Sequence, residues 1–282
     1  MNAPKWDCVA TYHENPWTCG VTRWNQRLAQ ELGVPMVPIL SSEFLKYDRP
    51  LPSVKRSECD IDVYAWERIG QREFLEHDEQ GIRRWHPYRE GYEWLWCPET
   101  VPVYPRQLVE RGVVSVLCFG MMHKLQPERF RQLAALIRKD LRVFSVYVST
   151  AIHEGTALDA QFTKAYEDIS AIFNGRTQFL GWLADAAIGT VLSQSHLFAA
   201  FFPSGVRANN TTVMSALAAG CPVITNLDAR SPEWLIHGQT VLDINQCDTL
   251  PESVYLEDIG WRGQTIAQAR YSWAKLIEVL CA

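Results

Sequence analysis

The sequence lacks several features that would assign it to a special class of protein. None of its eight cysteines forms a C-x-x-C pair, so neither a zinc site nor a disulfide framework is indicated. No apolar run reaches the length of a membrane span, and residues 1–7 contain no apolar signal core. Internal repeats and low-complexity tracts are also missing. We therefore expect a cytoplasmic protein without a membrane span.

An excess of positive charge is missing as well. The formal net charge of -5 argues against a surface that coats nucleic acid, although it leaves room for a local basic patch. The hydrophobic fraction of 47% and the charged fraction of 21% are those of an ordinary globular protein. A length of 282 residues suits one large α/β domain or two modest ones.

The second half of the chain alternates between strand-like and helix-like runs. Apolar runs predict strands at 113–119, 143–150, 178–181, 197–203, 221–225 and 240–244. Helices are predicted at 129–139, 157–173, 185–195 and 210–219, with a short one near 232–237. This alternation implies a parallel sheet with helices on both faces. Such sheets bind ligands beyond the carboxyl ends of their strands.

The first half is less regular. We predict strands at 8–13, 35–40, 61–66 and 92–97 and a helix at 21–32, and we leave 71–90 unassigned. Prolines at positions 98, 102 and 105 indicate a boundary before residue 113. We expect a first domain at 1–108 and a second domain at 109–264. A last helix is predicted at 265–280.

Polar residues follow two of the predicted strands in the second half. Gly120, His123 and Lys124 combine a close backbone approach with a point charge, which suits a diphosphate; a solvated turn is the alternative. His153 and Glu154 follow the next strand. They could act in acid–base chemistry or bind hydroxyls, and an ordinary surface loop is the alternative.

A third loop, at 202–212, is the most informative. It contains Ser204, Gly205 and Arg207 and then four small polar residues at the start of a predicted helix. Those four are Asn209, Asn210, Thr211 and Thr212. The free N–H groups and the dipole of a helix start favour anions. Capping of the helix explains one of the four residues, but not four in a row behind an arginine.

Several motifs surround this loop. The chain has P-S at 203–204, A-L-A-A-G-C-P-V-I at 216–224, P-E-W-L-I-H-G at 232–238 and G-W-L-A-D at 181–185. Together they resemble the donor-binding segment of the family-4 retaining glycosyltransferases, including a lysine at the place of Lys124 that contacts the donor diphosphate. The final helix, with Ser272 and Trp273, is similar to the closing helix of that family. C-G-V-T-R-W-N at 19–25 resembles its acceptor-facing glycine loop, which adds Gly20.

The resemblance implies an α/β protein of the GT-B type, with two Rossmann-like domains whose parallel sheets face a cleft. These would be a reduced acceptor-side domain at 1–108 and a nucleotide-sugar donor-binding domain at 109–264, with the segment 265–282 packing back onto the first. It implies an enzyme that transfers a hexosyl or pentosyl group from a UDP- or GDP-sugar, with retention and without a metal or other cofactor. The acceptor would be a hydroxyl of a glycan, a lipid-linked molecule or a small molecule. Lys124 and the helix start would stabilise the leaving diphosphate, His153 and Glu154 would line the donor sugar, and His13 would lie near the acceptor.

The chain departs from the family at two acidic positions. The Glu-x7-Glu pair of the family falls on Arg207 and Ser215. Ser215 cannot bind a ribose diol as a carboxylate does. We hypothesise that Arg207 supplies charge to the diphosphate, because guanidinium pairs well with phosphate and the usual arginine after the first strand appears here as Met121 or Met122. A non-catalytic nucleotide-sugar-binding relative is the alternative.

Two motifs of the first half bear on metal binding and on the acceptor. Asp60 and Asp62 form an Asp-x-Asp triplet, which is the metal motif of the other major glycosyltransferase fold, but such triplets often occur by chance and we assign no metal there. A basic and aromatic patch would suit an acceptor such as a modified DNA base, or it is a solvated loop. It consists of Arg83, Arg84, Trp85, His86 and Arg89. The acidic net charge weighs against DNA.

Overall fold

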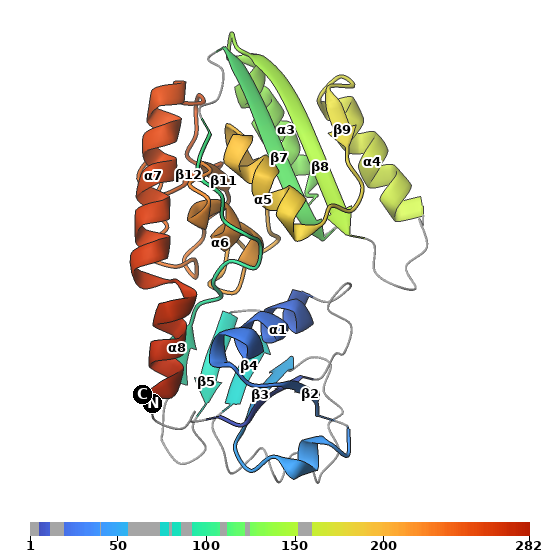
Figure 1. Ribbon diagram of the computed structural model, residues 1–282. Coiled ribbons are helices and arrows are strands. Elements are labelled where there is room, and N and C mark those ends of the chain that lie inside the picture. Colours follow the sequence, from blue (N-terminus) through green and yellow to red (C-terminus); the bar gives the residue numbers. More distant parts are fainter. Residues whose placement is uncertain are drawn as a thin grey trace. The chain divides into compact units, whose positions relative to one another are not determined.

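The computed structural model describes residues 6–11, 20–39, 41–55, 74–78, 81–85, 92–107, 112–121, 125–151 and 160–282. The chain divides into two compact units, each with its own sheet (Figure 1). The first unit consists of Met1–Thr100 with Tyr271–Ala282, and the second is Val101–Arg270. The first change of unit therefore comes before the boundary expected at 108. Contacts explain the difference, because Gln107 donates its backbone N–H to the Ser193 carbonyl at 3.0 Å, within the second unit.

The second unit is built on a six-stranded sheet in the order β12-β11-β10-β7-β8-β9, and every pair is parallel. The strands are β7 (Val113–Met121), β8 (Val143–Ala151), β9 (Thr177–Phe179), β10 (Leu197–Ala199), β11 (Val223–Thr225) and β12 (Leu242–Asp243). The chain runs outward from β7 to β9 and then returns to the other side of β7. The strand order therefore reverses between β7 and β10, which is where doubly wound sheets bind ligands. The predicted parallel sheet is confirmed.

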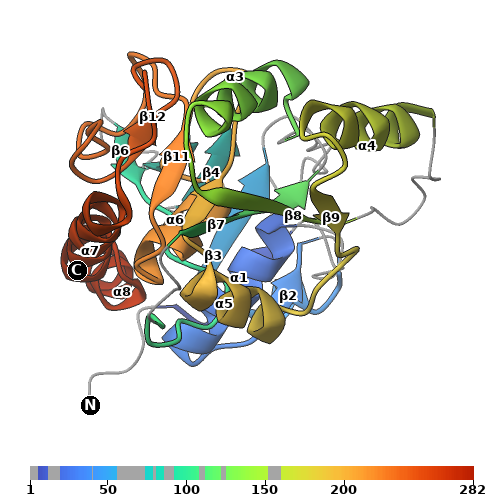
Figure 2. The same cartoon turned by 90° about the horizontal axis from the view of Figure 1, so that it is seen from above.

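Helices cover this sheet on both faces. They are α3 (Pro127–Arg138), α4 (Ala160–Ile172), α5 (Asp185–Gln194), α6 (Thr211–Ala218) and α7 (Ser253–Arg270). Figure 2 shows α3 and α4 on one side of β7 and β8, with α5 on the other side. On α3, the buried residues Phe130, Leu133 and Ala134 recur at helical spacing and face the core. Burial on both faces explains why the strands appear in the sequence as continuous apolar runs.

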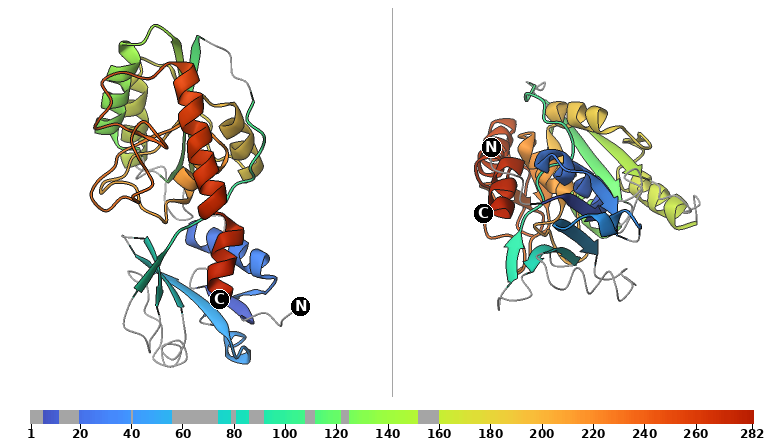
Figure 3. Two further views of the ribbon diagram at one scale, coloured as in Figure 1. Left: turned by 90° about the vertical axis from the view of Figure 1, so that its left-hand side faces the viewer. Right: turned by 60° about the horizontal axis from the view of Figure 1, so that its bottom comes forward.

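The last helical segment differs from its prediction. Instead of one helix at 265–280, α7 ends at Arg270 and α8 (Trp273–Cys281) begins after a two-residue break (Figure 3). Ser272 has an extended backbone, with φ of -78° and ψ of 166°, so helical hydrogen bonding is interrupted there. The break coincides with the passage of the chain from the second unit to the first.

The first unit has a mixed sheet in the order β2-β1-β3-β4-β5-β6. Its strands are β1 (Cys8–Thr11), β2 (Met36–Pro38), β3 (Pro50–Lys55), β4 (Phe74–Asp78), β5 (Gly81–Trp85) and β6 (Tyr92–Leu95). The first four in space are parallel, whereas β5 and β6 are antiparallel to their neighbours. Only two residues separate β4 from β5, too few for a parallel crossover. The unassigned segment 71–90 thus contains two strands, and the strand predicted at 61–66 lies outside the described residues.

The core of the first unit contains residues from both ends of the chain. Within its described residues the helices are α1 (Gly20–Leu32), the short 3-10 helix η1 (Phe44–Lys46) and α8. The rings of Trp24 on α1 and Trp273 on α8 lie 5.8 Å apart. Trp273 donates its indole N–H to the Glu99 carbonyl at 2.8 Å, and Trp6 donates to the Leu280 carbonyl at 3.1 Å. The last helix is therefore part of this unit.

The short helix predicted near 232–237 is wrong, because turns occupy this segment. The hydroxyl of Thr240 accepts the Ile236 N–H at 2.8 Å and donates to the Trp234 carbonyl at 2.8 Å. A side chain thus takes the backbone groups that a helix would pair. None of the helices in the described ranges combines the length and apolarity needed to cross a bilayer.

Candidate functional site

Two loops at the carboxyl edge of the second sheet form the candidate site. One follows β10 at residues 200–210, and the other follows β11 and begins at Asn226. Asn226 is buried and joins them. Its amide accepts the Phe202 N–H at 2.9 Å and donates to the Phe202 carbonyl at 2.7 Å, and its backbone carbonyl accepts the Val206 N–H at 3.1 Å. The Asn226 side chain thus serves the Phe202 backbone in place of a second strand and holds one loop against the other.

Arg207 and Asp228 connect the same two loops by charge. The two terminal nitrogens of Arg207 donate to the two carboxylate oxygens of Asp228, both at 2.8 Å. They also donate to the carbonyls of Val206 and Ser204. All four hydrogens on these two nitrogens are therefore used inside the protein. The guanidinium side chain is only 5% exposed, while the carboxylate is 35% exposed.

Asp228 is also held by its own loop. Its Oδ1 accepts the backbone N–H of Arg230 at 2.9 Å and the hydroxyl of Ser231 at 3.4 Å. Hydrogen bonds from Arg207 lower the pKa of Asp228, so the carboxylate is ionised at neutral pH. Its Oδ2 has a single hydrogen-bond partner, Nη2 of Arg207, among the described residues.

Gly205 gives Asp228 the space it occupies. A Cβ placed on Gly205 would lie 2.8 Å from Cγ and 2.9 Å from Oδ2 of Asp228. The glycine also has a φ of +79°, in the left-handed region that favours glycine. Two independent requirements thus select a residue without a side chain beside the carboxylate.

The start of α6 contains the four small polar residues of the sequence motif. Asn210 is the N-cap, but its side chain accepts the Arg207 backbone N–H at 2.6 Å instead of capping the helix. Asn209 and Thr211 are half-buried, and Thr212 is buried. Ser215 lies deeper in α6 and is fully buried. The placement of Ser215 among the donor-binding residues stays a prediction, and it would require access to a side chain that the core covers.

The remaining predicted residues are distributed as follows. Gly120 lies near the end of β7 with a φ of +125°, and Ser204 is exposed in the loop after β10. Gly20 begins α1 in the first unit. Lys124, His123, His153, Glu154 and His13 lie outside the described residues, as do Asp60, Asp62, His86 and Arg89. Arg83, Arg84 and Trp85 belong to β5.

Sequence reasoning missed Asp228 and Asn226. Both follow the predicted strand at 221–225, where an apolar run gives way to T-N-L-D. The rule that directed attention to the other strand ends applies here too. What the sequence did not contain was any sign that Asp228 pairs with an arginine 21 positions earlier.

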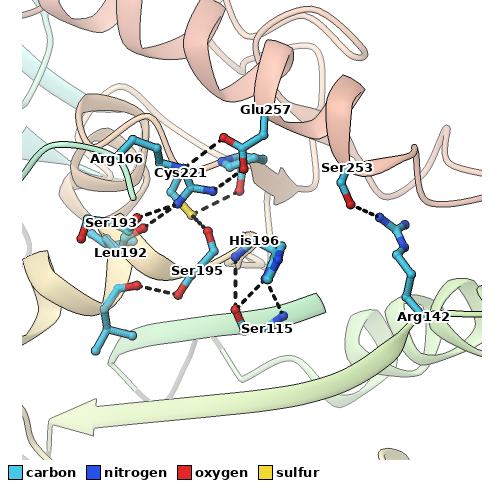
Figure 4. Close-up of polar contacts among 12 residues, drawn as sticks. Arg106, Ser115, Arg142, Leu192, Ser193, Ser195, His196, Cys221, Ser253 and Glu257 are labelled. Atoms are coloured by element: carbon cyan, nitrogen blue, oxygen red, sulfur yellow. Dashed lines mark hydrogen bonds and ion pairs between the residues drawn. The ribbon is translucent and has the colours of Figure 1, made fainter. Parts of the chain in front are cut away.

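A second polar cluster lies at the opposite, amino-terminal edge of the sheet (Figure 4). Ser115 and His196 contact each other at 3.0 Å, and Arg106 binds the Glu257 carboxylate at 2.9 Å. Burial raises the pKa of the Cys221 thiol to about 12, which keeps it protonated and unreactive. These groups satisfy one another within the fold, so the cluster has a structural explanation.

A cavity of about 440 Å³ lies at this amino-terminal edge as well, between the ends of α3 and α4. Apolar residues such as Phe144 and Ile172 line it, together with Arg138, Arg142 and Arg176. Arg142 is bound to Asp140 and donates to the Ser253 hydroxyl at 3.2 Å. The cavity is at the wrong end of the strands for the ligand site of a doubly wound sheet.

Comparisons with known proteins identify the fold. No protein-family model matches the chain, and no curated protein sequence matches it. Several solved structures do match the chain. HepE from Anabaena in complex with UDP-glucose is 13% identical, with a TM-score of 0.57 over 97% of this chain and 98% of that one. A glycosyltransferase from Rickettsia africae is 12% identical, with a TM-score of 0.56 over 98% of this chain and 97% of that one.

AviGT4, a glycosyltransferase involved in avilamycin A biosynthesis, is similar to the same extent. It is 13% identical, with a TM-score of 0.55 over 96% of this chain and 98% of that one. The fold is therefore α/β of the GT-B type along nearly the whole chain.

Proposed function

We propose that this protein is a glycosyltransferase that uses a nucleotide-sugar donor. The observation that carries the proposal is the pair of joined loops after β10 and β11, because the loop after β10 lies beside the reversal of strand order between β7 and β10. The GT-B fold supports it, and HepE, a chain of similar fold, has been solved with UDP-glucose. UDP- and GDP-sugars are the donors to test first.

The proposed catalytic work is electrostatic. As the glycosidic bond breaks, negative charge develops on the leaving diphosphate, and fixed donors stabilise it. We assign this role to Lys124 and to the positive end of the α6 dipole at Asn209–Thr212. The backbone N–H groups of Asn210, Thr211 and Val213 already donate to the carbonyls of Arg207, Asn209 and Asn210, so the dipole and not these N–H groups carries the assignment. Gly120 would allow the backbone after β7 to approach the phosphates. His153 and Glu154 would line the donor sugar, with His13 on the acceptor side.

Arg207 receives a different role from the one expected from the sequence. Its terminal N–H groups bind Asp228 and two backbone carbonyls, so its charge is balanced within the protein. We propose that it positions the two loops and does not contact the diphosphate. We further propose transfer with retention and without an essential metal, to a hydroxyl of a glycan, a lipid-linked acceptor or a small molecule.

A thermal-shift screen against UDP-, GDP-, dTDP- and CMP-sugars, with and without EDTA, tests the proposal. We expect one nucleotide class to raise the melting temperature, with no effect of EDTA and with loss of the shift in Lys124→Ala. Lys139→Ala is the matched control, because Lys139 lies at the amino-terminal edge and donates to the Asp248 carbonyl. No shift with any donor contradicts the proposal. A shift abolished by EDTA would direct attention to Asp60 and Asp62.

A non-catalytic nucleotide-sugar-binding protein is the second candidate. It is favoured because Arg207 and Ser215 stand at the two acidic positions of the resembled family and neither supplies an acidic contact. Ser215 is also buried, and Arg207 is paired with Asp228 inside the protein. Donor turnover decides between the two. Binding without release of free nucleotide, with or without a panel of sugar and lipid-linked acceptors, would favour the binding protein.

A further inference from the structure

We propose that Asp228 binds a hydroxyl group of the donor sugar, through the carboxylate oxygen Oδ2. The inference rests on the proposed function and names a contact residue for the same site. It assigns the acidic role in this site to the loop after β11, whereas the loop after β10 contains no acidic side chain.

The open acceptor on Asp228 is the first observation. Oδ1 already accepts from Arg207, Arg230 and Ser231, whereas Oδ2 accepts only from Arg207 among the described residues. A carboxylate oxygen has two lone pairs, so Oδ2 can accept one more hydrogen bond. The Asp228 side chain is 35% exposed, so a ligand can approach the side chain from solvent.

The orientation of this acceptor is fixed before any ligand arrives. Arg207 holds both oxygens in a bidentate pair, and the backbone N–H of Arg230 holds Oδ1 from the other side. A pre-oriented acceptor loses little side-chain freedom when it binds, which increases the affinity that its hydrogen bond provides. Because Gly205 has no side chain, the carboxylate can lie directly against the loop after β10.

Charge indicates which part of the donor this acceptor can meet. An ionised carboxylate accepts hydrogen bonds only, and it repels phosphate. Arg207 offsets that repulsion by balancing the charge, but it does not turn Asp228 into a donor. The hydroxyl-bearing parts of a nucleotide sugar therefore suit Oδ2, whereas the diphosphate does not. Of these parts we assign the donor sugar, and the comparison below separates it from the ribose.

The test compares sugar nucleotides with their parent nucleotides. Isothermal titration calorimetry would measure the Kd of UDP-glucose against UDP, and of GDP-mannose against GDP, for the full chain and for Asp228→Asn. We expect the variant to weaken sugar-nucleotide binding by about ten- to hundredfold and to leave nucleotide binding unchanged. Deoxy derivatives of the sugar should identify the hydroxyl, because its removal weakens binding to the wild type but not to Asp228→Asn.

Asp140→Asn is the matched control, since Asp140 forms a comparable pair with Arg142 at the opposite edge of the same sheet. An unchanged ratio of the two Kd values in Asp228→Asn would overturn the inference. So would an equal loss of nucleotide and sugar-nucleotide binding, which a contact with the ribose or a purely structural role produces. If the wild type binds no sugar nucleotide of the thermal-shift screen, the proposed function fails and takes the inference with it. Should Asp228→Asn not fold, Arg207→Lys serves instead, because it leaves the carboxylate without its bidentate partner. This variant should also bind the sugar nucleotide less tightly relative to the nucleotide than the wild type does.

Discussion

Removal of the Arg207 guanidinium should destabilise the protein by a measurable and bounded amount. Arg207→Met keeps an apolar stem but removes four hydrogen bonds, two of them to the Asp228 carboxylate. Breaking a fully buried pair costs about 3–5 kcal/mol. Here the abandoned carboxylate is 35% exposed and regains water, so we expect a loss of about 2–3 kcal/mol.

Urea and thermal unfolding, followed by circular dichroism, would measure this loss. For a unit of this size the melting temperature should fall by about 5–10 °C. Arg262→Met is the control, because Arg262 pairs with Asp258 on an exposed helix surface. That variant should lose less than about 0.5 kcal/mol. In a double-mutant cycle, Arg207→Met combined with Asp228→Asn should lose about 1–2 kcal/mol less than the sum of the single variants.

The contribution of the pair should also depend on pH in one direction. Because Arg207 lowers the pKa of Asp228 below 3.8, the ionised pair stabilises the folded state above that value. As the pH falls below about 4 toward the lowered pKa, Asp228 becomes protonated in the folded state too and the stabilisation is lost. The gap in unfolding free energy between wild type and Arg207→Met should therefore be constant from about pH 7 to about pH 5 and shrink in acid. A variant within about 0.5 kcal/mol of wild type at neutral pH, or a gap that grows in acid, would refute the reasoning.

Three further outcomes are expected. Gly260→Ala should lower the melting temperature despite the better helix propensity of alanine, because the new Cβ would lie 2.4 Å from a backbone carbonyl oxygen. Gly20→Ala should be neutral in the same assay, because no atom of the described residues lies within 4 Å of the new Cβ. Brief alkylation of the native protein at about pH 8, mapped by mass spectrometry, should modify the exposed Cys281 and spare Cys221, whose pKa burial raises to about 12; equal labelling would contradict the packing of α6 against β11. Trp273→Phe should cost about 1–2 kcal/mol in urea unfolding through the lost indole hydrogen bond, and Trp273→Ala about 3–5 kcal/mol through the cavity as well; similar losses would show that the hydrogen bond and not the ring stabilises α8.

The positions of the strands in the second unit could be read from the sequence. A strand buried on both faces needs apolar residues at every position, and the runs at 113–119 and 143–150 match β7 and β8 closely. The carboxyl ends of those strands are fixed once the strands are. The sequence therefore located the loop that contains Arg207, whereas the part that the loop after β11 takes in the candidate site was missed.

Only the tertiary structure decided what these loops do with their charges. Nothing in the sequence indicates an ion-pair partner for Arg207, because Asp228 follows a different strand. The loop of Asp228 comes next to the loop of Arg207 only when β10 and β11 pair in the sheet. The same reason explains the other differences. The Thr240 hydroxyl replaces helical partners in 232–237, and Ser272 ends one helix where the chain changes unit. The hydrophobic pattern of the sequence indicates which residues of one helix or strand are buried. The pairing of polar groups depends instead on which elements come together in space.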